Sequence, residues 1–207
     1  MHDRPFRTPP HDPLDRRGAL ARLATAALSL TGLTAFRRFG AEATRIAAPK
    51  WDDRFELAVD LEIAPQQGYR YHRPYVAVWV EDAGGRPVRT LSLWVNTSGR
   101  GPRYIRELRR WFSMDRDQED AGGPDIISTV SSATRLPGQY TVTWNGRDDR
   151  GSVVDQGNYR VVIEAAREHG SYQLMQQDLT LTTKPVAADL AGNEEIGRVR
   201  VEYRRRK

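Results

Sequence analysis

Hydroxyl side chains are concentrated in one stretch of the sequence, residues 128–138, which reads STVSSATRLPG. A hydroxyl that accepts a bulky covalent group must be exposed, and small neighbours let a modifying enzyme bring phosphate and metal close to the oxygen. Ser131, Ser132 and Ala133 are small, and the Leu-Pro-Gly turn that follows places Thr134 near the end of any strand. The stretch therefore predicts an accessible threonine that could carry a covalent group. The alternative is a plain Ser/Thr-rich strand end.

Only two histidines lie beyond the first 40 residues, His72 in YRYHRP and His169 in REHG. Together with Tyr71 and Arg73 they form a candidate contact surface, because aromatic and Arg side chains are enriched at interfaces. An enzyme built around both histidines and nearby carboxylates is a weaker alternative, since these groups would have to converge in one pocket. The remaining alternative is that His72 and His169 are ordinary polar residues of loops.

Other catalytic and metal-binding patterns are missing from the sequence. There is no cysteine, which excludes thiolate metal sites and a Cys nucleophile. Gly-x-Ser-x-Gly, His-Glu-x-x-His and phosphate-binding glycine loops are also absent. Asp148 and Asp149 beside a glycine turn suggest calcium, but the alternating oxygen ligands and later Glu of an EF-hand are lacking. We predict neither a metal site nor a catalytic residue.

The first 43 residues have the layout of a signal peptide. An uncharged apolar run, residues 23–36, follows Arg16 and Arg17 and precedes the small-x-small triplet 41–43. The arginines resemble a twin-arginine export signal, with Ala19 where that pattern favours Phe. The run is short for a transmembrane helix, which needs roughly 20 residues. We predict a leader over 1–43, a linker over 44–54 and a periplasmic location; a retained anchor and a buried amphipathic helix are the alternatives.

Length and charge limit the remaining possibilities. With 207 residues, 39% of them hydrophobic, the chain is long enough for one domain with a core of its own. The formal net charge is +5, and residues 1–43 alone hold seven arginines against four acidic residues. The basic balance therefore predicts no nucleic-acid partner, and membrane contact is expected only through the leader or a partner protein.

Period-two alternation predicts strands, and a change of period predicts one helix. Apolar residues alternate with polar ones over 55–63, the first of several expected strands. Ile105, Leu108, Trp111 and Phe112 recur at helical spacing, and the following segment 115–124 is expected to be a charged loop. Further strands are predicted at 75–81, 88–95, 139–145, 158–164, 171–181 and 196–203.

About eight short strands and one short amphipathic helix predict an antiparallel β-sandwich for residues 55–207. The segment 144–159, WNGRDDRGSVVDQGNY, places Gly, Asp and Asn where tight turns need them. It resembles a corner of the immunoglobulin-like module found in flagellar hook-capping proteins and many bacterial surface proteins. The expected fold class is therefore mainly β and immunoglobulin-like.

The segment SSAT, residues 131–134, resembles the acceptor motif of periplasmic FAD:protein FMN transferases, Asp-x-x-Ser/Thr-Gly/Ser-Ala-Thr. That resemblance implies FMN held covalently on Thr134 through a phosphoester. Ser128 stands where the motif has its leading Asp, and the nearest acid, Asp125, comes three residues earlier.

Several blocks of residues 55–181 resemble a family of predicted periplasmic proteins, domain of unknown function 2271. The matching blocks are RPYVAVWVED from Arg73, VRTL from Val88, the Leu108 helix, SATR from Ser132, the Trp144 corner and EAAREHG from Glu164. Its relatives are associated with flavin transferases and with PepSY-type membrane redox proteins.

This resemblance implies a non-catalytic accessory or carrier in a flavin-linked extracytosolic redox system, with a flavin transferase and a PepSY-type protein as partners. Trp79, Trp94 or Tyr71 could then stack on the flavin, although ordinary core packing is the favoured role of such side chains. The alternative function is an immunoglobulin-like binding or structural module of the cell envelope.

Overall fold

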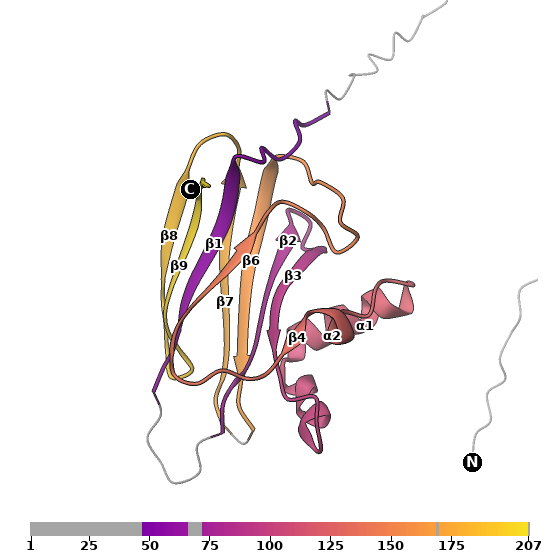
Figure 1. The fold of residues 1–207 in the computed structure, drawn as a ribbon, viewed down its shortest axis with the longest axis vertical. Coiled ribbons are helices and arrows are strands. Elements are labelled where there is room, and N and C mark those ends of the chain that lie inside the picture. Colours follow the sequence, from indigo (N-terminus) through magenta and orange to yellow (C-terminus); the bar gives the residue numbers. More distant parts are fainter. Residues whose placement is uncertain (1–46, 66–71, 169, 207) are drawn as a thin grey trace, which may run out of the picture. The chain divides into compact units, whose positions relative to one another are not determined.

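Two β-sheets packed face to face form the framework of the described chain (Figure 1). The computed structural model describes residues 47–65, 72–168 and 170–206, within a unit that spans Arg45–Lys207. The predicted leader with Arg16 and Arg17, and the candidate contact residues Tyr71 and His169, lie outside the described residues.

One sheet has the strand order β5-β1-β9-β8 and the other has the order β4-β3-β2-β6-β7. All pairings are antiparallel except the short parallel pair of β3 with β4. The elements are β1 (Phe55–Ile63), β2 (Tyr75–Asp82), β3 (Pro87–Trp94), η1 (Gly101–Glu107), α1 (Arg109–Asp120), α2 (Ile126–Val130), β4 (Ser131–Ser132), β5 (Gly138–Trp144), β6 (Gly157–Ala166), β7 (Tyr172–Leu181), β8 (Val186–Ala191) and β9 (Ile196–Arg205).

The main core lies between the sheets and follows the alternation seen in the sequence. Leu57, Val59, Leu61 and Ile63 of β1 are buried in this core, since successive side chains of a strand point to opposite faces. Residues of β2, β6 and β9 complete it, among them Val78, Ile163 and Tyr203. The predicted β-sandwich is confirmed.

A second hydrophobic cluster covers the outer face of the five-stranded sheet. Trp79, Leu93 and Val162 of that sheet pack with Leu108 and Trp111 from the helical segment. Figure 1 shows α1 and α2 beside β3 and β4. The sequence predicted one short helix, but the described chain has the helical segments η1, α1 and α2, which together form a third layer.

The predicted charged loop at 115–124 was wrong over its first half, because α1 continues to Asp120. The helix begins against the sheet: the buried Glu164 carboxylate of β6 accepts the backbone N–H groups of Arg110 and Trp111, at 2.9 and 2.8 Å. These N–H groups have no partner within the helix. A carboxylate from a distant strand thus satisfies the first turn of α1.

Trp51, which precedes β1, packs into the end of the main core. Its ring centroid lies 4.8 Å from that of Trp144 and 5.1 Å from that of Tyr203. Its indole N–H donates to the Phe55 carbonyl at 3.2 Å. Gly146 in the corner after β5 has φ +75°, and a Cβ there would come within 2.2 Å of the Trp51 ring. The corner and the segment before β1 are therefore fitted to each other.

Candidate functional site

The SSAT segment lies where the chain crosses from one sheet to the other. Ser131 and Ser132 form β4, which pairs in parallel with Leu93 and Trp94 at the end of β3. The Val95 N–H donates to the Ser132 carbonyl at 2.9 Å. The chain then leaves this sheet and enters β5 at the edge of the other sheet.

Thr134 lies in this connection and is half-buried, while Ala133 before it is exposed. No described residue forms a hydrogen bond with the Thr134 hydroxyl. A hydroxyl without a hydrogen bond, on a partly exposed residue outside the strands, suits an acceptor, because a modifying enzyme need not break a hydrogen bond to use it.

Arg135 and Leu136 make the surface next to Thr134. The Arg135 guanidinium lies over the Trp94 ring, 5.6 Å from its centroid, and Leu136 is 55% exposed. The Tyr140 hydroxyl donates to the Leu136 carbonyl at 2.8 Å, which fixes the turn. This surface combines a cation with an exposed apolar side chain.

The tryptophans proposed to stack on a flavin are not available for it. Trp79 and Trp94 have exposed fractions of 0% and 4%, and their rings pack in the two hydrophobic clusters. The stacking expectation was wrong for both, and ordinary core packing is confirmed. Tyr71 lies outside the described residues.

Asp125 lies beside the position where the acceptor motif has its acid. It is the N-cap of α2, and its carboxylate accepts the Ser128 N–H at 2.9 Å and the Ser128 hydroxyl at 2.6 Å. These hydrogen bonds lower the pKa of Asp125. The N-cap geometry therefore holds a carboxylate within hydrogen-bond distance of Ser128, although the sequence places the acid three residues early.

The candidate contact surface is exposed where it is described. His72 and Arg73 are exposed, and the His72 Nδ1 lies 3.9 Å from the Glu168 carboxylate. His72 and Glu168, the described residues that come next to Tyr71 and His169 in the sequence, are thus close together. In the described residues no group of three or more His, Asp or Glu side chains could hold a metal ion.

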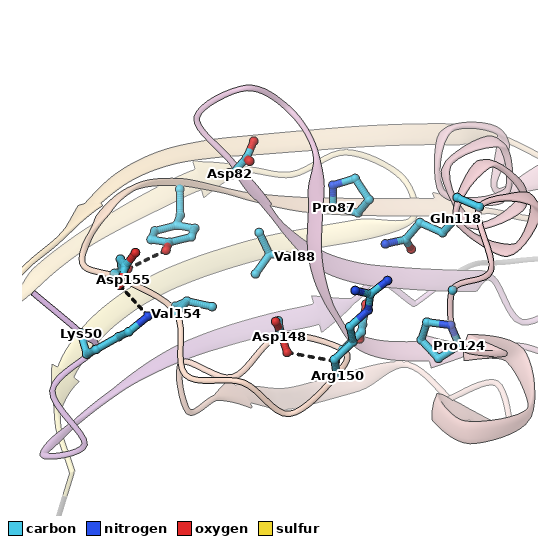
Figure 2. Close-up of a pocket in the computed structure, with 14 residues that line it drawn as sticks. Lys50, Asp82, Pro87, Val88, Gln118, Pro124, Asp148, Arg150, Val154 and Asp155 are labelled. Carbon is cyan, nitrogen blue, oxygen red and sulfur yellow. Dashed lines mark hydrogen bonds and ion pairs between the residues drawn. The ribbon is translucent and has the colours of Figure 1, made fainter. Parts of the chain in front are cut away.

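A cleft of about 490 Å³, lined by both charged and apolar side chains, lies at the other end of β3 (Figure 2). It is bounded by the β2–β3 turn, the end of α1 and the connection between β5 and β6. Figure 2 shows Lys50 and Asp155 joined at one end of it, and Arg150 pointing into it. The sequence does not reveal this cleft, because its walls come from four segments that are distant in the chain, Lys50 before β1 being the fourth.

The two neighbouring aspartates of the cleft have different roles. Asp148 shapes the turn, because its carboxylate accepts the backbone N–H groups of Arg150 and Ser152 at 3.0 and 2.8 Å. Asp149 has a side chain that is only 6% exposed. One of its oxygens accepts the Thr90 N–H at 3.3 Å and lies 3.6 Å from Arg89 Nε. The other, Oδ2, is buried and has no hydrogen-bond partner among the described residues.

Burial raises the pKa of Asp149, and Arg89 only partly offsets this. Asp115 on α1 is affected more: burial, followed by the charges of Glu119, Asp125 and Asp149, raises its pKa to about 6. Burial is therefore the main reason that both carboxyl groups hold a proton more tightly than usual.

Comparison with protein families identifies residues 56–198 as a predicted periplasmic protein (DUF2271). The chain belongs to this family. The description of DUF2271 supports a periplasmic location. No curated protein and no solved structure matches the chain. Among the described residues, no helix is long and apolar enough to cross a membrane.

Proposed function

We propose that this DUF2271 protein carries FMN on Thr134 and acts as an accessory or carrier in a flavin-linked redox system of the periplasm. The observation that supports it most is Thr134 itself, a half-buried residue whose hydroxyl forms no hydrogen bond with any described residue. The proposal includes an immunoglobulin-like fold, twin-arginine export through Arg16 and Arg17, and two partners, an FAD:protein FMN transferase and a PepSY-type membrane redox protein.

The residues around Thr134 fit such a group. A phosphoester on Thr134 would place negative charge one residue from Arg135, whose guanidinium lies over the Trp94 ring, and guanidinium is a good phosphate partner. Exposed Leu136 offers apolar surface at the same place. FMN, when bound, supplies reversible one- and two-electron chemistry; the protein's part is to hold it at the surface.

Asp125 supplies a carboxylate next to Ser128, the residue that stands where the acceptor motif has its acid. Its carboxylate is hydrogen-bonded to the Ser128 hydroxyl at 2.6 Å and is kept ionised by a lowered pKa. A transferase that needs negative charge at this position would therefore meet the Asp125 carboxylate instead of one on residue 128.

The deciding experiment exports the chain together with an active FMN transferase and measures its intact mass and in-gel flavin fluorescence. We expect one FMN adduct, lost in Thr134→Val and kept in Thr143→Val, a matched control on an exposed threonine of β5. A chain that stays unmodified while a known acceptor is labelled in the same cells would reject the carrier hypothesis. The binding or structural module would then be the better description.

The role of Asp125 is tested separately by Asp125→Asn. Asparagine is an equally good N-cap, so α2 should persist, which circular dichroism would check. We expect the labelled fraction to fall, and Ser128→Asp in the same background to restore it. Equal labelling of all three chains would show that the acid has no role in recognition.

A further inference from the structure

We propose that the arginine row of η1, which consists of Arg100, Arg103 and Arg106, binds the anionic headgroups of phospholipids. The proposal rests on the spacing of these three exposed side chains along a 3₁₀-helix. It would give the β-sandwich a membrane contact of its own. The row is separate from Thr134, and the proposal does not depend on the proposed function.

The helix geometry places the three arginines on one side of η1. Gly101–Glu107 is a 3₁₀-helix, and its N-cap Arg100 also has helical backbone angles, φ −88° and ψ −7°. A 3₁₀-helix has about three residues per turn and rises about 2 Å per residue, so side chains three positions apart lie in line, about 6 Å from one another. In an α-helix the same spacing would rotate each side chain by about 60° from the one before. The local geometry of η1 therefore aligns these cations.

The positive charge of the arginine row is not neutralised within the described chain. All three side chains are exposed, and none forms a hydrogen bond or an ion pair with a described side chain. Glu107 is the one acidic residue in the segment 96–109, and it is half-buried. Arginines elsewhere differ, since Arg86, Arg160 and Arg200 each pair with an aspartate. The row is thus available to an external anion.

The arginine row lies at one end of the sandwich, next to the start of β2. The Tyr75 hydroxyl of β2 donates to the Gly101 carbonyl at 3.0 Å, which ties η1 to this strand. Figure 1 shows η1 below α1 in this view, at the end where β3 finishes and β2 starts. Arg73, two residues before Tyr75, is exposed and has no ion pair with a described residue. It adds a further cation to this end of the molecule.

An anionic phospholipid surface fits the row better than an acidic protein segment does. Guanidinium groups bind phosphate oxygens through two parallel hydrogen bonds, and a lipid surface presents many phosphates side by side to a row of exposed side chains. Half-buried Tyr104 has the Arg103 guanidinium 5.1 Å from its ring centroid, and tyrosine is enriched at membrane–water interfaces. A periplasmic location, which the family description supports, brings the chain close to a membrane.

The binding would be electrostatic and peripheral. The large apolar side chains that are exposed in the described chain, Leu136 and Leu174, lie in other segments. Insertion into the hydrocarbon layer is therefore not expected from η1. Attraction between exposed charges is screened by salt, so binding should be lost at an ionic strength of about 0.5 M, where the Debye length is about 4 Å.

The test measures amide hydrogen exchange of the full chain with two kinds of vesicle. One kind is made of phosphatidylcholine alone, and the other of phosphatidylcholine mixed with phosphatidylglycerol, an anionic lipid. A local measurement is needed, because the apolar run 23–36 can bind lipid by itself. We expect exchange in residues 96–109 to become slower with the phosphatidylglycerol vesicles only, and to return to its original rate at high salt.

Variants with equal loss of charge test the position of the surface. Changing all three arginines of the row to Gln should weaken docking about a hundredfold, since each basic residue near an anionic membrane contributes about fivefold. Residues 96–109 should then exchange as they do with phosphatidylcholine. The control changes three exposed arginines of other surfaces to Gln and should weaken docking less than about threefold; these are Arg116, Arg150 and Arg198. Circular dichroism would check that both variants keep the fold.

Three results overturn the proposal. Exchange in residues 96–109 that does not change with phosphatidylglycerol vesicles would show that η1 does not contact lipid. Equal protection in the row variant, the control variant and the parent chain would assign the contact to other residues. Slower exchange with an oligoglutamate peptide, but not with the vesicles, would make the arginine row a binding surface for an acidic protein segment.

Discussion

At the scale of single residues, the structure separates carboxylates that look alike in the sequence. Asp125 and Asp148 are tied to backbone N–H groups of their own turns. Asp115 and Asp149 are buried by contacts with distant segments, and burial raises the pKa of both. Sequence patterns could identify the first pair as turn and cap residues. They could not identify the second, because burial depends on the fold.

Asp115 is expected to make stability depend on pH. Its pKa is about 6 in the folded chain against 3.8 for the ordinary group, so the folded state holds this proton more tightly. The free energy of unfolding should therefore fall as pH rises from about 4 to about 6, by about 2 kcal/mol. Glu119, Asp125 and Asp149 raise this pKa together with burial, and Arg116 opposes them.

Asp115→Asn should remove this fall and make the chain more stable at pH 7 than the parent chain. Urea unfolding at pH 4.5 and pH 7 measures the difference, with Asp117→Asn on the exposed side of α1 as the control. Identical pH profiles of the Asp115→Asn chain and the parent chain would contradict the assignment.

Thr134 shows what the sequence could predict at a candidate site. Small neighbours and the following turn predicted accessibility, and the structure leaves the residue half-buried on a connection between strands. The contact of Asp125 with Ser128 follows an ordinary N-cap pattern, but the sequence analysis predicted no helix at this place, because α2 has only five residues. The Ser/Thr-rich composition of the stretch had suggested a strand instead.

At the scale of elements, the helical layer depends on one buried side chain. Glu164 is fully buried on β6 and caps α1 through two backbone N–H groups. An anion at a helix N-terminus also interacts favourably with the helix dipole. The link from β6 to α1 therefore fixes where α1 starts.

Glu164→Gln should destabilise the chain by about 2 to 4 kcal/mol, because an amide cannot accept both hydrogen bonds as a carboxylate does and its NH₂ would face N–H donors. The substitution should also increase the rate of amide hydrogen exchange more in α1 than in β1. Glu119→Gln, exposed on the same helix, is the matched control. Unchanged exchange in α1 would mean that the cap contributes nothing to the helix.

The strands were largely predictable, whereas of the helices only the apolar part around Leu108 and Trp111 was predicted. Period-two alternation marks β1 directly, whereas the Ala-rich VAADLA of β8 has too little contrast and was missed. Of the polar residues 115–120, those at 116, 117, 119 and 120 lie on the open side of α1, whereas Asp115 is buried and Gln118 is half-buried. Their helical state comes from the packing of Trp111 and Leu108 on the sheet, which composition does not reveal.

At the scale of the whole described unit, one end of the sandwich is closed by a chain segment that lies outside both sheets. Trp51 fills the space between Trp144 and Tyr203, and Gly146 leaves room for it. The glycine spacing of the 144–159 corner predicted a tight turn, but not that the turn receives a ring from residues before β1.

Gly146→Ala is expected to destabilise the chain by about 3 kcal/mol or more, because φ is +75° and the new Cβ would meet the Trp51 ring at 2.2 Å. Denaturant unfolding measures this loss. Gly151→Ala, at φ +83° but with open space around it, isolates the backbone strain and should cost about 1 kcal/mol. Equal losses in the two variants would mean that Trp51 does not occupy the corner.

The crossing segment that carries Thr134 is anchored at both ends, through β4 to one sheet and through β5 to the other. A group attached there would be held at one place on the protein surface. It could not move between partners as the lipoyl or phosphopantetheine arm of a carrier protein does. Electron exchange would then require each partner to approach the same exposed side of the sandwich. Two partners would compete for binding to that side. The rate of electron transfer from one to the other would then be limited by the rate at which one dissociates and the other binds.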